Sequence, residues 1–193
     1  MKVLVVGGGG REHAIIKSVK NSPLCDELYA VPGNGGIAQD AICTDIAATD
    51  IECVVDFAVE KEIDFVIVAP DDPLVMGLVD KLHEKNIKCF GPSMAAAQIE
   101  GSKVFSKHLM EKYQIPTAGY NVFDDVKSAK EYIKSKNEYP VVIKADGLAY
   151  GKGVIIAVDE KEAMNALESI MNDKVFGNSG DQVVIEEFKN IEL

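Results

Sequence analysis

The sequence predicts an α/β protein in which a doubly wound parallel sheet is followed by a small, separate αβ unit. Over the first half of the chain, short and continuously apolar strands alternate with helices. This pattern is typical of a parallel sheet that is buried on both faces. Pro116 and Gly119 interrupt the pattern, and a new series of strands and helices begins after them. The boundary between the two units is therefore expected near Gly119.

Four strands are predicted in the first unit, and each ends in a loop of turn-forming residues. The strands cover residues 2–6, 28–31, 64–69 and 87–90, and the helices 12–20, 51–61 and 75–85. Ligands of such sheets bind beyond the carboxyl ends of the strands. We therefore expect one substrate site at that edge, formed by the loops 7–11, 32–36, 70–73 and 91–93.

The chemistry of these loops suits a small phosphorylated or polyhydroxylated substrate. Arg11 and backbone amides are expected on a phosphate, and Asp71 or Asp72 on hydroxyl groups or an amine. The alternative is that each loop is only a turn, because Gly, Asn, Asp and Pro dominate turns in general. Four such loops at one edge favour a site.

The same loops disfavour a dinucleotide site. Glu12 occupies the position of the third glycine in the dinucleotide fingerprint. The second strand ends at Val31 and Pro32, where an acidic residue normally holds the ribose. We therefore expect neither a nicotinamide nor a flavin cofactor.

In the second unit, two strands flank a glycine-rich loop that carries lysines. The strands cover residues 141–143 and 154–158. The residues of interest between them are Lys144, Gly147, Gly151, Lys152 and Gly153. Glycines let the backbone approach a ligand closely, and lysines add positive charge. The spacing is not that of a Walker A loop, and a strand follows where that motif has a helix. We interpret the loop as a lid over nucleotide phosphates; the alternative is an ordinary turn with two solvated lysines.

Further elements complete the second unit. Helices are predicted at 104–113, 126–136 and 161–171, and strands at 120–123 and 183–187. Asp159 and Glu162 resemble a capping box for the helix 161–171, whose apolar stripe is expected in the core. The last strand ends in Glu186, Glu187 and Phe188, which are expected to present backbone groups to an adenine edge, with Glu192 near the ribose. The alternative is that these residues are only a strand end with solvated glutamates.

Composition excludes several classes of function. The 193 residues have a net charge of −11, so no basic field attracts nucleic acid or an anionic membrane. The four cysteines show no metal-ligand spacing and suggest free thiols in a reducing compartment. The apolar run after Met1 and Lys2 is too short for a signal peptide or a membrane span. We expect a cytoplasmic protein that acts on small molecules.

Taken together, these stretches resemble the phosphoribosylamine–glycine ligases (glycinamide ribonucleotide synthetases), a family of the ATP-grasp superfamily. The matching stretches are KVLVVGGGGREHA, VPGNGGIA, APDDPLVMGLVD, FGPS, AAQIEGSKVFSK, IPTAGY, VVIKADGLAYGKGV and VVIEEF. They resemble the N-terminal part of that family. The resemblance implies a Rossmann-like, pre-ATP-grasp substrate domain at 1–102, a helical linker at 103–119, and the small lid subdomain of an incomplete ATP-grasp fold at 120–193.

The resemblance also implies roles for individual residues. Lys144 and Lys152 would act in catalysis. The ATP site would comprise Lys103, Lys144, Gly147, Gly151, Lys152, Gly153, Glu186, Glu187, Phe188 and Glu192. The substrate site would comprise Gly8, Gly9, Gly10, Arg11, Asn34, Gly35, Gly36, Asp71, Asp72 and Pro73.

The implied activity is the ATP-dependent ligation of glycine to 5-phosphoribosylamine, through a glycyl phosphate, giving glycinamide ribonucleotide, ADP and phosphate. The implied cofactors are ATP and Mg²⁺ or Mn²⁺, with metal ligands beyond Leu193, so this chain is expected to be a fragment that is inactive alone. Two alternatives remain: another ATP-grasp carboxylate–amine ligase, and a module that binds a nucleotide or sugar phosphate without turnover.

Overall fold

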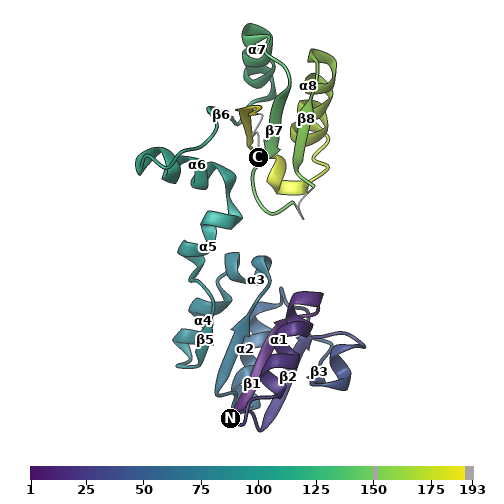
Figure 1. Cartoon of the computed structure of the whole chain (residues 1–193), viewed down its shortest axis with the longest axis vertical. Coiled ribbons are helices and arrows are strands. Elements are labelled where there is room, and N and C mark those ends of the chain that lie inside the picture. The colour runs from purple at the N-terminus through teal and green to yellow at the C-terminus, as the bar shows by residue number, and fades with distance from the viewer. Residues whose placement is uncertain (150–151, 190–193) are drawn as a thin grey trace. The chain divides into compact units, whose positions relative to one another are not determined.

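The computed structural model describes residues 1–149 and 152–189 of the chain. The chain forms two compact units, Met1–Ala97 and Gln98–Leu193. Each unit has its own sheet (Figure 1). Each unit also has its own hydrophobic core. Within the described ranges, no helix combines the length and the apolar character that a membrane crossing requires.

The first unit is built on a parallel sheet of five strands in the order β3-β2-β1-β4-β5. The strands are β1 Lys2–Gly7, β2 Glu27–Pro32, β3 Ile42–Cys43, β4 Phe65–Val68 and β5 Lys88–Phe90. The strand order reverses between β1 and β4, so the prediction of a doubly wound parallel sheet is confirmed. The sequence does not predict β3, because two residues are too few to show a periodic pattern.

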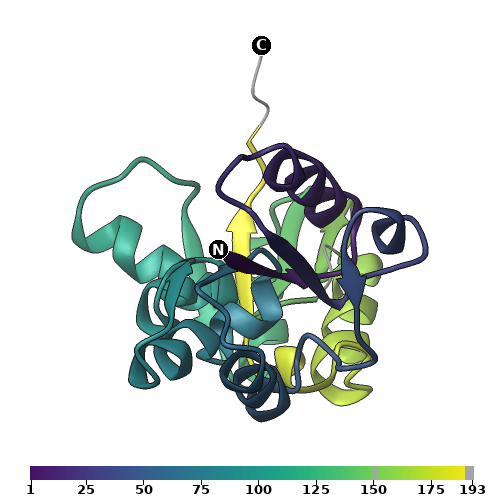
Figure 2. The same ribbon diagram turned by 90° about the horizontal axis from the view of Figure 1, so that it is seen from below.

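Helices cover both faces of this sheet. They are α1 Gly10–Lys20, α2 Ile51–Glu60, α3 Asp71–Val75, α4 Leu78–Glu84 and the 3-10 turn η1 Ile37–Gln39. Side chains of a strand alternate between faces, so Val3 and Val5 of β1 pack with Ile16 of α1. Leu4 and Val6 pack on the other face in the core that α2 and α4 complete. α1 and α2 therefore lie on opposite faces of the sheet (Figure 2).

The prediction of one continuous helix over 75–85 is wrong. α3 ends at Val75 and α4 begins at Leu78. Gly77 lies between them with φ +87°, a left-handed conformation that glycine adopts at little cost and that interrupts a helix. Asp71 and Asp72, which the sequence places in a loop, instead form the first turn of α3. Carboxylates are favoured there by the helix dipole.

The second unit contains an antiparallel sheet of four strands in the order β6-β9-β7-β8. The strands are β6 Tyr120–Phe123, β7 Val141–Ala145, β8 Val154–Ala157 and β9 Val183–Glu187. The helices are α5 Met94–Gly101 (which spans the boundary between the units), α6 Lys103–Lys112, α7 Val126–Lys136 and α8 Glu160–Leu167. Two short elements follow α8: a π-helical turn η2 Glu168–Asn172 and a 3-10 turn η3 Gly177–Gly180. The α-helix predicted to end at Met171 therefore ends at Leu167 and widens into the π turn.

One face of this sheet packs on α7 and α8 (Figure 1). The predicted apolar stripe of α8 and η2 is confirmed as core, with Ala163, Leu167 and Ile170 fully buried. One of the two hydrogen bonds of the predicted capping box is present at the start of α8, because the Asp159 carboxylate accepts the Glu162 N–H at 2.8 Å. The Glu162 carboxylate reaches the N–H of the residue before Asp159, so the capping box is shifted by one residue.

Candidate functional site

The second sheet places Lys144 and Glu186 beside each other on the face opposite to α7 and α8. Ile143 of β7 points into the core, so Lys144, the next residue, points to the other face. In the antiparallel pairing of β7 with β9, Val142 lies opposite Glu186 and Lys144 opposite Val184. Glu186 is therefore the diagonal neighbour of Lys144. We call this side, which carries Lys144 and Glu186, the lysine face.

Three charged groups meet on the lysine face. Lys144 Nζ lies 2.8 Å from Glu186 Oε1, and Lys107 Nζ of α6 lies 3.2 Å from Glu186 Oε2. The side chains of Lys107 and Glu186 are 8% and 7% exposed, whereas that of Lys144 is 26% exposed. Among the described residues, Oε1 accepts no aligned hydrogen bond despite the close ammonium, so its contact with Lys144 is an ion pair only. Lys144 is the member of this cluster that a ligand can reach.

The start of α6 is tied to the start of the glycine-rich loop. Ser102, the N-cap of α6, donates from its hydroxyl to the Asp146 carboxylate at 3.1 Å, and the Val104 N–H donates to the same carboxylate at 3.1 Å. Lys103 Nζ donates to the Gly147 carbonyl oxygen at 2.8 Å. Burial lowers the pKa of the Lys103 ammonium, and the Asp146 carboxylate offsets only part of that effect. Lys103 is thus a partly desolvated cation at the base of the loop.

The glycines at the two ends of the loop allow close packing within the protein. Gly147 has φ +93°, and a Cβ there would lie 2.7 Å from the Ser179 hydroxyl. A Cβ at Gly153 would lie 2.6 Å from the Cβ of Ala149. Lys152 between them is exposed. These glycines therefore shape the base of the loop, while Lys152 faces solvent.

The predicted adenine-binding strand end separates into two sides. Glu186 joins the lysine face, whereas Glu187 accepts the Gly119 N–H at 2.8 Å through Oε1 and donates its own N–H to the Gly119 carbonyl at 3.0 Å. The Gly119 N–H, and then the Lys189 ammonium 2.9 Å away, lower the pKa of the Glu187 carboxyl. Phe188 is 38% exposed. Two further residues of the predicted ATP site, Gly151 and Glu192, lie outside the described residues.

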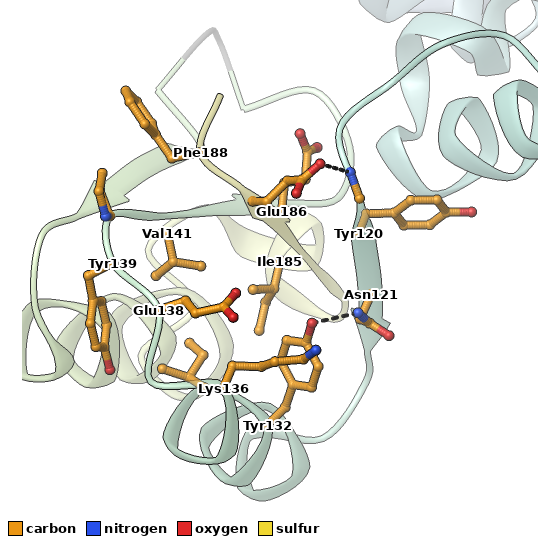
Figure 3. A pocket seen from close by; sticks show the side chains of 14 residues that line it. Tyr120, Asn121, Tyr132, Lys136, Glu138, Tyr139, Val141, Ile185, Glu186 and Phe188 are labelled. Carbon is orange, nitrogen blue, oxygen red and sulfur yellow. Dashed lines mark hydrogen bonds between the residues drawn. The ribbon is translucent and has the colours of Figure 1, made fainter. Parts of the chain in front are cut away.

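A cavity of about 520 Å³ lies beside α7, where β7 begins and β9 ends (Figure 3). Its lining includes Tyr132 and Lys136 of α7, together with Glu187 and Phe188. The predicted phosphate-binding lysines are not among the lining residues. The predicted ATP residues therefore form a lysine-rich group on the lysine face and a strand end that borders this cavity, and Glu186 belongs to both.

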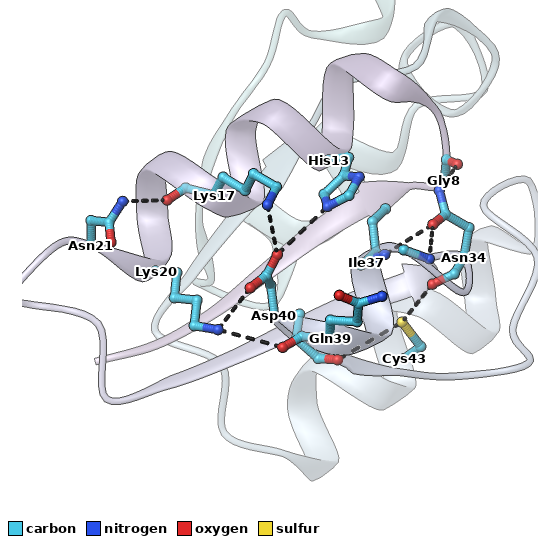
Figure 4. A network of polar contacts seen from close by, with 12 residues as sticks. Gly8, His13, Lys17, Lys20, Asn21, Asn34, Ile37, Gln39, Asp40 and Cys43 are labelled. Atoms are coloured by element: carbon cyan, nitrogen blue, oxygen red, sulfur yellow. Dashed lines mark hydrogen bonds and ion pairs between the residues drawn. The ribbon is translucent and has the colours of Figure 1, made fainter.

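In the first unit, Asn34 joins the loops that follow β1 and β2 (Figure 4). Its side-chain amide donates to the Gly8 carbonyl at 2.7 Å, and its oxygen accepts the N–H groups of Gly36 and Ile37 at 2.8 and 2.9 Å. A Cβ at Gly8 would lie 2.5 Å from the Gly33 carbonyl oxygen, so the two loops touch. The structure thus brings Gly8 and the 34–36 loop together, as the prediction of a shared edge requires.

The loop after β4 lies next to the loop after β1. A Cβ at Gly7 would lie 2.8 Å from the Pro70 ring. Asp71 and Asp72 follow in the first turn of α3, and Pro73 is buried there. By contrast, a Cβ at Gly91 would lie 2.9 Å from apolar side chains of α3 and α4, so the fourth predicted loop is packed against helices at this point.

The remaining substrate-site candidates surround the N-terminus of α1. A Cβ on Gly10 or Gly35 would meet no atom within 4 Å, so both face open space. The Arg11 side chain is 72% exposed and its Nε lies 3.9 Å from Glu12 Oε1. Glu12 is 4% exposed and accepts the Gly9 N–H at 2.6 Å, which fixes the shape of the glycine-rich loop.

Three polar residues of these sites are not predicted from the sequence. Lys107 lies one helical turn after Lys103, and that four-residue spacing was the available signal. Asp146 lies directly between the end of β7 and Gly147, the first glycine of the loop. A carboxylate at such a strand end can accept hydrogen bonds from the start of a nearby helix. Glu12 stands three residues after Gly9, the spacing of a capping box.

Comparison with known proteins assigns both units to one family. The N domain of phosphoribosylglycinamide synthetase matches residues 1–100, and its ATP-grasp (A) domain matches residues 101–192. A phosphoribosylamine–glycine ligase from Caldanaerobacter subterraneus subsp. tengcongensis is 51% identical over 187 residues, which is 97% of this chain and 45% of that protein. The chain spans less than half the length of the curated relatives it matches.

Solved structures agree with this assignment. The phosphoribosylamine–glycine ligase of Thermotoga maritima superposes with a TM-score of 0.77 at 31% identity, over 97% of this chain and 44% of that chain. The biotin carboxylase domain of 2-oxoglutarate carboxylase from Hydrogenobacter thermophilus, solved with MgADP and bicarbonate, gives a TM-score of 0.76 at 25% identity, over 97% of this chain and 44% of that one. The fold is that of the family's N domain followed by part of its ATP-grasp (A) domain. The chain belongs to the phosphoribosylglycinamide synthetase family.

Proposed function

We propose that the protein carrying this chain is a phosphoribosylamine–glycine ligase. The observation that supports this most directly is the arrangement of Lys103 and Lys144 beside the glycine-rich loop, in a chain whose two halves both match the family. Two ammonium groups and a loop of backbone N–H groups suit the triphosphate of ATP.

The proposed reaction has two steps. The γ-phosphoryl group of ATP passes to the glycine carboxylate, which breaks the bond to ADP and forms glycyl phosphate. The amine of 5-phosphoribosylamine then attacks the acyl carbon, phosphate leaves, and the amide nitrogen loses a proton. Lys144, Lys103 and Lys152 contribute by holding the phosphates and countering their negative charge.

The first unit is proposed to bind 5-phosphoribosylamine at the carboxyl edge of its sheet. The amides of Gly8, Gly9 and Gly10 with the exposed Arg11 suit a phosphate. The carboxylates at the start of α3 suit the ribose hydroxyls or the amine. The full set proposed for this site is Gly8, Gly9, Gly10, Arg11, Asn34, Gly35, Gly36, Asp71, Asp72 and Pro73.

The proposed cofactor set includes a divalent metal, Mg²⁺ or Mn²⁺. Residues 1–149 and 152–189 contain no group of three or more His, Cys, Asp or Glu side chains that could hold a metal ion. We therefore assign no metal ligand to the described residues and derive no step through the metal. The cysteines Cys25, Cys43, Cys53 and Cys89 are free, which suits the proposed cytoplasmic location.

The test is a turnover assay with the full-length protein. ADP release is expected to require both glycine and 5-phosphoribosylamine, and Lys144→Met is expected to weaken ATP use at least about tenfold. Lys112→Met, an exposed lysine of α6, is the matched control. ADP release that occurs equally with other amino acids, or none with glycine, would contradict the proposal.

A second candidate is an ATP-grasp ligase with another carboxylate substrate. The likeness to the biotin carboxylase domain, which was solved with bicarbonate, is the observation in its favour. Replacing glycine with bicarbonate in the same assay separates the two, because only the substrate that is phosphorylated supports ADP release. Nucleotide binding without ADP release under any condition would instead indicate a module that binds without turnover.

A further inference from the structure

We propose that Lys107 is a positioning residue of the nucleotide site: it neutralises Glu186 and so leaves the positive charge of Lys144 available to an anionic ligand. The inference deepens the proposed function and rests on it, because it takes Lys144 to be a ligand of nucleotide phosphates. It assigns a task to a residue that is not among the site residues predicted from the sequence.

The contacts of Lys107 are directed entirely at the protein. Its ammonium lies 3.2 Å from Glu186 Oε2 and donates to the Thr117 hydroxyl at 2.7 Å and to the Ala118 carbonyl at 3.4 Å. It also lies 5.3 Å from the centre of the Tyr120 ring. Two hydrogen bonds and an ion pair therefore engage this ammonium, which has three donors, with protein groups on several sides. With a side chain only 8% exposed, Lys107 is not placed to meet a ligand.

Lys144 differs from Lys107 both in its exposure to solvent and in its contacts with protein groups. Its side chain is 26% exposed, and Glu186 is the only acidic group within 4 Å of its ammonium in the described part of the chain. Because that contact is an ion pair without an aligned hydrogen bond, the N–H donors of Lys144 are open to a ligand. The shared carboxylate therefore separates two lysines into one that is permanently engaged and one that faces outward.

The net charge of the cluster explains why Lys107 matters. Lys107, Lys144 and Glu186 together carry one net positive charge, which suits a polyanion. Without Lys107, Lys144 and Glu186 form a neutral pair, and the triphosphate has to compete with a carboxylate 2.8 Å away for the same ammonium. Such competition is strong at a site with little solvent, because charges interact more strongly at low dielectric.

Packing alone does not account for a lysine at this position. A buried ammonium loses its hydration, and an apolar side chain of similar length would fill the same space without that loss. Lys107 and Glu186 are both nearly buried and lie 3.2 Å apart, so each places an opposite charge beside a group that has lost most of its water. The ion pair of Lys107 with Glu186 is therefore explained if the site needs the Glu186 carboxylate and also needs a Lys144 whose charge Glu186 does not cancel.

The experiment measures binding of a non-hydrolysable ATP analogue to the full-length protein by titration calorimetry. The variants are Lys107→Met, Lys107→Arg, Glu186→Gln and the double variant Lys107→Met/Glu186→Gln, with Lys112→Met as the exposed control on the same helix. Circular dichroism and thermal unfolding identify the variants that fold. Binding of an analogue does not depend on which substrate is ligated.

We expect Lys107→Met to weaken analogue binding about tenfold, the scale of a lost contact with a charged group. Lys107→Arg is expected to keep most of the affinity. The decisive result is the double variant, in which the carboxylate of Glu186 is replaced by an uncharged amide that no longer competes for Lys144. It should bind within about threefold of the wild type, so the two changes are far from additive.

A merely structural Lys107 predicts the opposite, because a second change in the same cluster would not restore binding. A double variant that binds as weakly as Lys107→Met, or a folded Lys107→Met that binds like the wild type, would overturn the inference. If Lys107→Met does not fold, the double variant decides alone, since replacing a buried ion pair by an uncharged pair is often tolerated. A wild-type protein that binds no nucleotide would overturn the proposed function itself.

Discussion

Lys103, the first residue of α6, donates a hydrogen bond of 2.8 Å to the carbonyl oxygen of Gly147, the first glycine of the loop between β7 and β8. The pair joins the helix that carries Lys107 to the loop that we propose to cover the phosphates. A ligand that binds Lys103 therefore acts directly on the base of the loop.

Lys103→Met is expected to weaken ATP binding about tenfold, because it removes one of the three proposed phosphate lysines and the hydrogen bond to Gly147. Lys103→Arg is the matched variant, since it keeps the charge. The KM for ATP of the full-length protein is the measurement. An unchanged KM in a folded Lys103→Met protein would remove Lys103 from the site.

The pH dependence of the same interaction follows from burial. Burial lowers the pKa of the Lys103 ammonium, so the wild-type protein is expected to lose ATP affinity on the alkaline side earlier than Lys103→Arg, whose guanidinium stays protonated. The effect on stability has the opposite sign. Between the folded and unfolded pKa values the unfolded chain binds more protons, so the free energy of unfolding rises with pH there. Parallel alkaline profiles of KM for the two proteins would contradict this prediction.

Glu187 is expected to make the second unit sensitive to acid. The Gly119 N–H and Lys189 hold its folded pKa below the usual 4.5. The unfolded chain therefore binds more protons between the two values, and the stabilisation, complete above the unfolded pKa, is lost as pH falls through the folded pKa. Glu187→Gln should flatten the decline of the unfolding temperature with falling pH. Glu131→Gln, on the exposed face of α7, is the control and should leave the slope unchanged.

Gly147→Ala is expected to destabilise the second unit by about 1–2 kcal/mol for the positive φ alone, with more from the overlap with Ser179. Adding Ser179→Gly removes the overlap but not the cost of φ +93°, so the double variant should recover only part of the loss. Chemical unfolding of the two variants and of Ser179→Gly alone measures this. Full recovery would mean that the backbone conformation contributes nothing.

Asn34→Ala is expected to loosen the edge of the first unit, because three hydrogen bonds are lost at an exposed site, at a total cost of about 1–3 kcal/mol. Asn34→Asp keeps an acceptor for the N–H groups of Gly36 and Ile37 but loses the donor to Gly8. Hydrogen exchange of those two amides should therefore quicken in Asn34→Ala and stay slow in Asn34→Asp. Gln39→Ala serves as an exposed control. Equal exchange of the two amides in the wild type, Asn34→Ala and Asn34→Asp would contradict the role given to the Asn34 side chain.

The local sequence was sufficient to predict the bounds of an element wherever that element has a strong periodic pattern and clear ends. β6, α7 and β9 have the predicted bounds 120–123, 126–136 and 183–187. Their apolar residues repeat at the period of the element, and Asp, Asn, Pro or Gly residues stand close to their ends. The parallel sheet of the first unit follows from the same information, because continuously apolar strands have to be covered on both faces.

Local sequence was insufficient where packing decides the conformation. The break at Gly77 and the π turn after Leu167 lie within apolar patterns that look continuous. Gly77 adopts a positive φ that the sequence permits but does not require. β3 forms because Ile42 and Cys43 pair with β2, a contact that no local pattern announces.

The candidate site shows the same division. The residues alone are enough to indicate the family, the order of most strands along the chain, and the presence of Lys103, Lys144 and Glu186 in a nucleotide-binding pattern. Which of the two adjacent glutamates joins the lysines depends on the folded sheet, because the register of β9 against β7 turns Glu186 to the lysine face and Glu187 away from it. Folding also brings Lys107 to Glu186 from a distant part of the chain, since ion-pair partners are set by the packing of α6 on the sheet and not by their distance in sequence.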